Sequence, residues 1–378
     1  MSRLRLMAMY WFTGFLCTLP VTAGSVEEIV SGAFNPSERC GECHKEIYAM
    51  WRKSLHSASA SDPIFQASYM QAYKETAGKA REVCLRCHAP VAVHTGDLEM
   101  RNPLSMEGIT CDYCHSITAV DMNQRDNPIR IALDGVKRGP LHDAVSPAHK
   151  VVRSALHESS EICGACHEYV NQFGVDIMST YSEWKASPQA AEGKTCQHCH
   201  MPLTPGETVP EVLAPSRGSI NLHNISGGHS TEQVRKAATV RILNVRRTSD
   251  NFAQIEVEVA NVGSGHSIPT GMPTRKLVLE VVLYSDGREV KRFEREYQKK
   301  ILDGKGSFIQ EDHRTILDGR SIMMDNRLQP GEKRIELFAA AILPRGTLRA
   351  EATLRYLYQP MILIPQTMSI EMATDRSQ

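Results

Sequence analysis

The stretch Cys40-Gly-Glu-Cys43-His44 decides the organisation of this chain, because its pattern of two cysteines, two spacer residues and a histidine occurs five times. Ten of the eleven cysteines belong to these units. The others are Cys84-Leu-Arg-Cys87-His88, Cys111-Asp-Tyr-Cys114-His115, Cys163-Gly-Ala-Cys166-His167 and Cys196-Gln-His-Cys199-His200. The eleventh cysteine, Cys17, lies in an apolar run near the N-terminus.

A disulfide framework or a set of zinc sites explains this pattern poorly. Disulfides do not require a histidine after each pair, and zinc sites pool four ligands, which leaves one of five pairs unmatched. Thioredoxin-like redox pairs need a βαβ context that the sequence lacks. Covalent attachment of haem c uses every residue, since the two thiols bond to the porphyrin and the histidine becomes the proximal iron ligand. The sequence therefore predicts five covalently attached haem c groups.

The N-terminus has the pattern of a secretory signal peptide. Arg3 and Arg5 precede an apolar stretch of 14 residues, Leu6 to Leu19, which is too short for a comfortable membrane span. Small residues then predict cleavage before Gly24. The alternative is an uncleaved anchor. We expect a periplasmic or extracellular protein, exported by the general secretion pathway and in the alternative case membrane-associated.

Composition excludes several other classes of protein. The chain has 378 residues, with 43 basic and 43 acidic side chains, so that it lacks the basic excess typical of nucleic-acid binding. Removal of the signal peptide leaves 41 basic and 43 acidic residues, a net charge of −2. The 42% hydrophobic share argues against a disordered chain, and one apolar run argues against a polytopic membrane protein.

We expect a multidomain α + β protein with three segments: a signal peptide (1–23), a pentahaem cytochrome c domain (24–234) and an antiparallel β-sandwich (235–378). The haem motifs lie too close together for five separate cores, so short helices and loops should pack around the haems. One helix is expected from His44 to about His56 and another from Asp62-Pro63, which is an N-cap followed by proline. Six β-patterned runs without a helix between them follow: 239–245, 252–262, 277–284, 288–297, 334–342 and 348–358.

Tyr48, Trp51 and Ser54 recur with the same spacing as Tyr181, Trp184 and Ser187. An internal duplication explains this recurrence, and so do two aromatic helix faces packed on haems. The sequence leaves both interpretations open.

The remaining ten histidines supply candidates for the second axial position of each iron. An iron with two histidine ligands is saturated and transfers electrons, whereas an iron without the second ligand is a candidate catalytic centre. His56 lies too far along the expected helix to share an iron with His44, so it should bind a different haem. His266 lies in a glycine-rich loop between two strands and is expected to join the sandwich to a haem. The distal candidates are His56, His149, His157, His223, His229 and His266.

Several of these segments resemble one superfamily. Cys40 to His44 followed by Tyr48, Trp51, Ser54 and His56 is similar to the opening of the multihaem cytochromes c that include the tetrahaem cytochrome of ammonia oxidisers, hydroxylamine oxidoreductase and octahaem tetrathionate reductase. Glu107 to His115 and Cys196 to Pro202 resemble later motifs of that group. The loop from Gly265 to Gly271 resembles a β-domain often attached to such cytochromes. The chain departs from these proteins in having five motifs, and none of its motifs ends in lysine.

The sequence favours an electron-transfer protein over a catalyst. We expect an extracytoplasmic pentahaem cytochrome with mostly bis-histidine haems, which exchanges electrons with a membrane quinol-linked donor or other cytochromes and does not bind nucleic acid. Two alternatives remain. One is an oxidoreductase that acts on a small nitrogen or sulfur compound at one five-coordinate haem, and the other is a subunit of a polymeric cytochrome filament.

Overall fold

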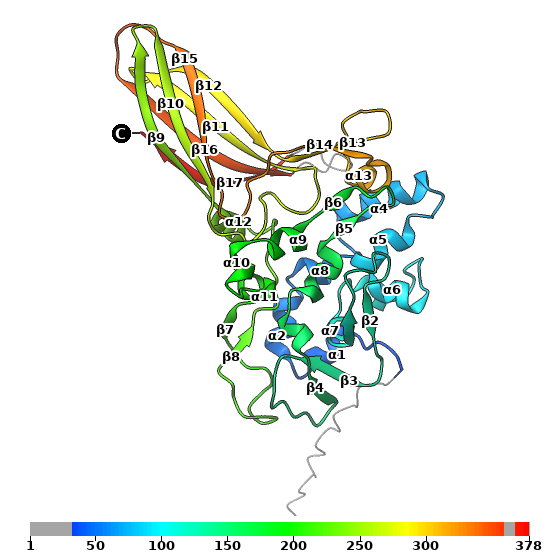
Figure 1. The fold of residues 1–378 in the computed structure, drawn as a ribbon. Helices are drawn as coiled ribbons and strands as arrows, with labels where there is room; N and C mark the ends of the chain where they lie inside the picture. The colour runs from blue at the N-terminus through cyan, green and yellow to red at the C-terminus, as the bar shows by residue number, and fades with distance from the viewer. Residues whose placement is uncertain (1–31, 359–366, 378) are drawn as a thin grey trace, which may run out of the picture.

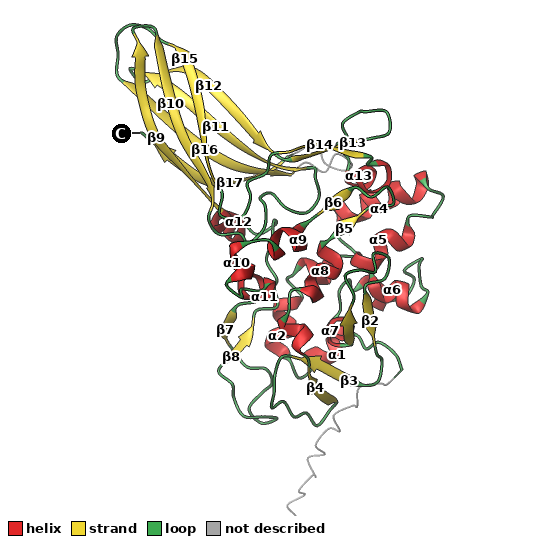
Figure 2. Cartoon of the chain, viewed as in Figure 1, coloured by secondary structure: helices red, strands yellow, loops and turns green. Residues whose placement is uncertain are grey.

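The computed structural model describes residues 32–358 and 367–377, so the expected signal peptide lies outside the described residues. Figure 1 shows two parts, a helical region that carries all five motifs and an elongated region of long strands that projects from it. Figure 2 shows that the helices gather in the first part and the long strands in the second. The expected mixed, multidomain architecture is confirmed. Among the described residues, no helix has the length and apolar character needed to cross a membrane.

The helical region consists of short helices joined by loops and two-stranded ribbons, as the many proline and glycine residues predict. α4 begins at Pro63, and the carboxylate of Asp62 accepts hydrogen bonds from the backbone N–H groups of Ile64 and Phe65, which confirms the predicted N-cap. The other helices are α1 (Ser37–Gly41), α2 (Lys45–Trp51), α3 (Leu55–Ala58), α5 (Arg81–His88), α6 (Pro90–Thr95), α7 (Cys111–His115), α8 (Glu161–His167), α9 (Thr180–Lys185), α10 (Pro188–Ala191) and α11 (Cys196–His200). Two 3₁₀ turns are η1 (Pro103–Met106) and η2 (Ala155–Glu158). The paired strands are β1 (Ile117–Val120) with β2 (Ile129–Ile131), β3 (Val136–Gly139) with β4 (Lys150–Arg153), β5 (Tyr169–Val170) with β6 (Asp176–Met178), and β7 (Leu203–Pro205) with β8 (Ser219–Asn221).

The predicted continuous helix from His44 to His56 is wrong. α2 ends at Trp51, and a separate helix, α3, begins at Leu55. The break has a local cause, since the hydroxyl of Ser54 accepts a hydrogen bond from the N–H of Ser57 and caps the second helix. A serine side chain that competes for backbone groups ends one helix and starts the next.

Two antiparallel sheets form the second region. One contains β15 (Lys333–Ala341), β10 (Phe252–Asn261) and β9 (Ala238–Ser249), and the other contains β12 (Arg288–Tyr297), β11 (Arg275–Ser285), β16 (Leu348–Tyr358) and β17 (Met368–Arg376). Alternate residues of β10, including Ile255, Val257 and Val259, point into a core that both sheets share. The six predicted runs correspond to six of these seven strands, and β17 was missed.

The link before β9 forms the helix α12 (Thr231–Ala237), capped by Ser230. The prediction that no helix interrupts the strands is wrong in one place. Between β12 and β15 the chain forms β13 (Lys299–Leu302), α13 (Asp312–Asp318) and β14 (Ser321–Asp325), and this excursion packs on the helical region. Ile301 and Ile309 from the excursion share an apolar cluster with Val175 and Ile177, which tethers the two regions.

The two regions differ in how much apolar core the protein supplies. One cluster of 24 buried residues fills the space between the sheets. The helical region, although it is longer, has two clusters of only five buried residues each, one around Tyr113 and one around Leu85. Protein interiors are close-packed, so a region with so few apolar side chains needs other material to complete its core.

Candidate haem-binding site

Each motif lies on or beside a short helical turn. In α7 and α11 the motif is the whole helix, and in α5 and α8 it forms the last turn. Two cysteines three residues apart in a helix face the same side, and the histidine follows directly. None of the ten motif cysteines is joined in a disulfide.

Thiols from different motifs are in contact. Cys40 of the first motif pairs with Cys111 of the third, and the hydrogen bond between them raises the pKa of Cys40. Cys163 of the fourth motif pairs with Cys196 of the fifth, and this hydrogen bond lowers the pKa of Cys196 to about 7. A third pair joins Cys87 of the second motif to Cys166 of the fourth. These contacts connect motif 1 with motif 3, and motif 4 with motifs 2 and 5.

Backbone carbonyls orient four of the motif histidines. The Nδ1 atoms of His44, His88 and His200 lie 2.7, 3.1 and 2.7 Å from the carbonyl oxygens of Thr208, Ser59 and Ser226. His115 has the same arrangement with Arg138, at 2.5 Å. A carbonyl oxygen can only accept, so Nδ1 carries the hydrogen and Nε2 keeps the lone pair that ligates a metal.

A second histidine stands opposite most of the motif histidines. The ring centres of His44 and His149 are 6.3 Å apart, and so are those of His167 and His56. The rings of His200 and His266 are 6.4 Å apart and nearly parallel. Those of His115 and His157 are 5.5 Å apart.

These separations test whether the residues fit an iron porphyrin. For two imidazoles on opposite sides of one metal ion, each metal–nitrogen bond is about 2.0–2.1 Å and each ring centre lies about 1.1 Å behind its nitrogen, so the ring centres stand about 6.3 Å apart. Three of the pairs match this value. In the described part of the chain no group of three or more His, Cys, Asp or Glu residues could hold a metal ion by protein ligands alone. A pair of imidazoles offers two donors, and a porphyrin supplies the other four.

Burial favours the neutral form of four of the paired imidazoles, and the neutral form is the one that binds a metal. Burial lowers the pKa of His115 and His167 to about 3 and the pKa of His56 and His266 to about 4. Among the expected distal residues, Nδ1 of His149, His223 and His266 also faces a backbone carbonyl oxygen, at 3.2, 2.6 and 3.0 Å.

The second motif differs from the others. The ring of His88 stacks on Phe65, with 3.9 Å between ring centres and an angle of 7° between planes, and the ring contacts of the described residues give it no second histidine. Of the expected distal residues, His229 has its ring contact with Tyr358, at 6.2 Å. His223 lies within electrostatic range of His115 and His44. The third motif thus has two neighbouring candidates, His157 and His223.

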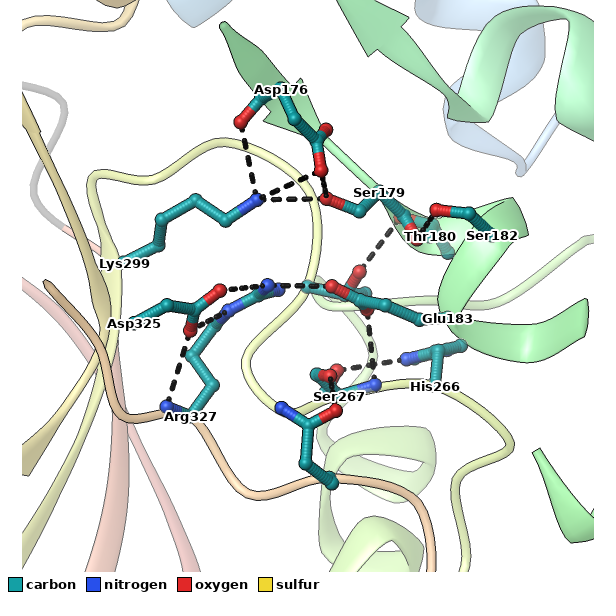
Figure 3. Close-up of polar contacts among 12 residues, drawn as sticks. Asp176, Ser179, Thr180, Ser182, Glu183, His266, Ser267, Lys299, Asp325 and Arg327 are labelled. Atoms are coloured by element: carbon teal, nitrogen blue, oxygen red, sulfur yellow. Dashed lines mark hydrogen bonds and ion pairs between the residues drawn. The ribbon is translucent and has the colours of Figure 1, made fainter. Parts of the chain in front are cut away.

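A buried polar network holds the loop of His266 against the helical region, as Figure 3 shows. Glu183 of α9 accepts a hydrogen bond from the N–H of Ser267 at 3.1 Å and forms a 2.6 Å ion pair with Arg327. Both side chains of the ion pair are at most 10% exposed. Lys299 adds a second link, since its Nζ donates to the hydroxyl of Ser179 at 2.8 Å. The sequence offered no motif for these residues, because they meet only when both regions are folded.

Three comparisons with known proteins bear on these observations. The family described as "Cytochrome c554 and c-prime" matches residues 39–116, which contain the first three motifs. The crystal structure of a penta-heme cytochrome c552 from Thermochromatium tepidum has a TM-score of 0.72 and 22% sequence identity, over 91% of this chain and 98% of that chain. The search of curated proteins found no match.

A CARDB domain from Pyrococcus furiosus overlaps 36% of this chain and 84% of its own length, at 15% identity and a TM-score of 0.17, which is too low to support an argument. The five motifs are those of haem c attachment, and over residues 39–116 the chain is similar to a family of c-type cytochromes. Its fold over nearly the whole length is that of the pentahaem cytochrome, and the comparisons support the prediction of five covalently bound haem c groups.

Proposed function

We propose that the protein is an extracytoplasmic pentahaem cytochrome that transfers electrons through closely packed, mostly bis-histidine haems. The observation that carries this proposal is the spacing of the histidine pairs, which at 6.3–6.4 Å fits one six-coordinate iron between each pair. A saturated iron has no site for substrate, and the chemistry that it supplies when bound is one-electron transfer.

The protein's contribution is to hold the ligands and to fill the space around them. Carbonyl groups fix the ring orientation of His44 and His200, and hydrogen bonds of this kind raise the basicity of an imidazole ligand. The two small apolar clusters of the helical region suit a core that the porphyrins complete. The thiol contacts support an arrangement in which the haems of motifs 1 and 3 are neighbours, and in which the haem of motif 4 lies beside those of motifs 2 and 5.

We assign His149, His56 and His266 as the distal ligands for motifs 1, 4 and 5. His157 and His223 are the candidates for motif 3. Nε2 of His157 lies 3.1 Å from the carbonyl oxygen of Cys114, whereas Nδ1 is buried without a partner. Nδ1 of His223 faces the carbonyl oxygen of Asn221, which leaves Nε2 free to ligate.

The mature chain is slightly acidic, and the haem propionates add further negative charge. We therefore propose that the redox partners, a quinol-linked donor or other cytochromes, present basic surfaces. The predicted signal peptide supports a periplasmic or extracellular location, and the segments noted above support kinship with the superfamily that includes hydroxylamine oxidoreductase.

A second candidate function rests on the second motif. His88 stacks on Phe65 and has no paired histidine ring among the described residues, so its iron is the best candidate for a five-coordinate centre. Such a centre would bind a small ligand and would make the protein an oxidoreductase.

The electron paramagnetic resonance spectrum of the oxidised holoprotein separates the two functions. The carrier predicts five low-spin ferric haems, and the oxidoreductase predicts one high-spin ferric haem that responds to small ligands such as cyanide. Intact mass after acid extraction of loose haem should show five attached groups. Fewer than five would contradict both functions in their present form.

Replacement of His266 with alanine tests the ligand that comes from the sandwich. We expect one additional high-spin haem and faster proteolysis near residues 230–236, because the loop loses its bond to the helical region. His198→Ala is the control, since His198 lies inside a motif and is not assigned as a distal ligand. An unchanged spectrum with unchanged protection of the link would remove His266 from the ligand set.

A further inference from the structure

Arg275 is a partly buried cation at the base of the sandwich. It begins β11 and lies opposite Tyr358 in the register with β16. One of its Nη1 hydrogens goes to the carbonyl oxygen of Thr270 at 3.2 Å, and its guanidinium carbon stands 5.2 Å from the ring centre of Tyr358. Its Nε is buried without a hydrogen-bond partner. Among the described residues it forms no ion pair.

The nearby carboxylate of Asp312 is occupied by other donors. Its Oδ2 accepts a hydrogen bond of 2.7 Å from the hydroxyl of Tyr358, and its Oδ1 accepts one from the hydroxyl of Thr274. Asp312 thus acts on the pKa of Arg275 only through the electric field of its charge, without contacting it. Because both oxygens of Asp312 accept hydrogen bonds from other side chains, Arg275 has no ion pair with it.

A second unsatisfied donor lies beside Arg275. Tyr356 is 4% exposed, and its hydroxyl has no hydrogen-bond partner. The hydroxyl lies 3.0 Å, and Nη1 of Arg275 lies 3.5 Å, from the point where a Cβ of residue 228 would stand. Because residue 228 is glycine, no side chain occupies the space beside the two donors.

Burying the Nε of a guanidinium and a hydroxyl without hydrogen-bond partners is unfavourable. Native proteins rarely leave such atoms unpaired, and two of them side by side point to a group that completes the site. A planar oxyanion is the ligand that a guanidinium binds best, since it accepts two parallel hydrogen bonds. The phenol adds a third donor.

Two sources of such an anion adjoin the site. Arg275 lies within electrostatic range of His167, the motif 4 histidine, and of His229. A haem held at motif 4 would bring its propionates into this neighbourhood. The gap beside Gly228 is the alternative place for a free carboxylate-sized anion.

We propose that Arg275 and Tyr356 form a receptor for a planar oxyanion, which is a propionate of a neighbouring haem or a free small anion. The inference rests on the proposed haem content of the protein. With a propionate in the receptor, the sandwich sets the potential of a haem in the other region. With a free anion, the receptor is a ligand site between the two regions.

The test compares the holoproteins of the wild type, Arg275→Gln and Tyr356→Phe, with Arg246→Gln as the charge-matched control. Arg246 is exposed on β9, where it bonds Gln254. The five midpoint potentials and the thermal midpoint are measured with and without formate, which is a redox-inactive carboxylate.

If a propionate fills the receptor, Arg275→Gln moves one potential in the negative direction, Tyr356→Phe moves the same potential less, and formate changes nothing in the wild type. If a free anion fills it, formate saturably shifts one potential and raises the thermal midpoint of the wild type, and Arg275→Gln weakens formate binding at least tenfold. If Arg275→Gln does not fold, Tyr356→Phe decides alone.

The proposal is overturned if the folded five-haem variants match Arg246→Gln in every potential and formate has no effect. Failure of the proposed function is a separate result, since it appears as missing haems in the wild type before any variant is made.

Discussion

Two stretches of the helical region, residues 37–58 and 160–191, make the same contacts in different places. Each begins with Ser-Glu-x-Cys-Gly-x-Cys-His. The hydroxyl of Ser37 accepts a hydrogen bond from the N–H of Cys111, and that of Ser160 accepts one from the N–H of Cys196. The first cysteine of one motif is thus tied to the turn before another motif in both copies.

The aromatic residues of the two stretches repeat this agreement. The indole N–H of Trp51 donates to the carbonyl of Ile109 at 2.8 Å, and that of Trp184 donates to the carbonyl of Lys194 at 2.9 Å. Ile109 lies two residues before Cys111 of the third motif, and Lys194 lies two residues before Cys196 of the fifth. Equivalent contacts at equivalent positions favour duplication over a coincidence of two aromatic faces.

The copies differ in the residue that follows the serine cap by two positions. The first has His56, which stands opposite His167 of the second copy. The second has Gln189, which packs instead against Gly265. The neighbouring His266 of the sandwich stands opposite His200. We infer that the first copy supplies His56 as a ligand to the haem of His167 in the second copy. The sandwich supplies His266 to the haem of His200, which follows the second copy in the chain.

The difference between the two copies is tested most directly by comparing two single variants, His56→Ala and Gln189→Ala. We expect His56→Ala to convert one haem to the high-spin form, because an imidazole is lost, and Gln189→Ala to convert none. Electron paramagnetic resonance of both oxidised holoproteins measures the difference. Equal spectra from the two variants would mean that the positions do not differ in function.

The docking of the second copy depends on a buried ion pair, so Arg327→Gln should have the next largest effect. It leaves the carboxylate of Glu183 buried without its cation, and burial already raises the pKa of Glu183. Removal of one partner of a buried pair costs about 3–5 kcal/mol.

Glu183→Gln is the matched variant and should cost less, because Arg327 keeps its ion pair with Asp325 at 2.7 Å. Denaturant unfolding of the holoproteins measures both free energies of unfolding. The reverse order of the two costs would show that Arg327 acts through another contact.

Gly41 and Gly164 occupy equivalent positions in the two copies, and substitutions there should have similar effects on stability. A Cβ at residue 41 would stand 2.5 Å from the ring of Tyr48, and one at residue 164 would stand 2.7 Å from the ring of Tyr181. Overpacking of this kind costs about 1–3 kcal/mol. Gly41→Ala and Gly164→Ala should therefore lower the thermal midpoint to a similar extent, and Gly174→Ala, where a Cβ meets open space but φ is +77°, separates crowding from backbone strain. A cost at only one of the two sites would contradict the equivalence.

The smallest expected effects come from Trp51→Phe and Trp184→Phe, which remove the N–H and keep the ring. A hydrogen bond is worth about 0.5–1.5 kcal/mol. Trp51 is 9% exposed, and the hydrogen bond of Trp184 is solvent-exposed, so the loss should be larger at Trp51. Chemical denaturation resolves the difference, and a larger loss at Trp184 would contradict the role of burial.

The sequence was sufficient for the parts of this protein that depend on neighbouring residues. The attachment chemistry follows from residues within five positions of one another, as in Cys40 to His44. The cap at Asp62 and the alternation in β10 are likewise local, since helix starts and strand faces depend on short-range geometry. Six strands were located for the same reason.

Only the tertiary structure decided which distant residues meet. His56 and His167 are more than a hundred positions apart in the chain, and their pairing depends on how the two copies pack. Glu183 and Arg327 carry no signal in the sequence, because an ion pair between two regions is visible only when both are folded. The excursion from β13 to β14 was missed because it gains its apolar partners, Val175 and Ile177, from the other region. Long-range contacts follow from the balance of burial and chain geometry over the whole molecule, which no local pattern encodes.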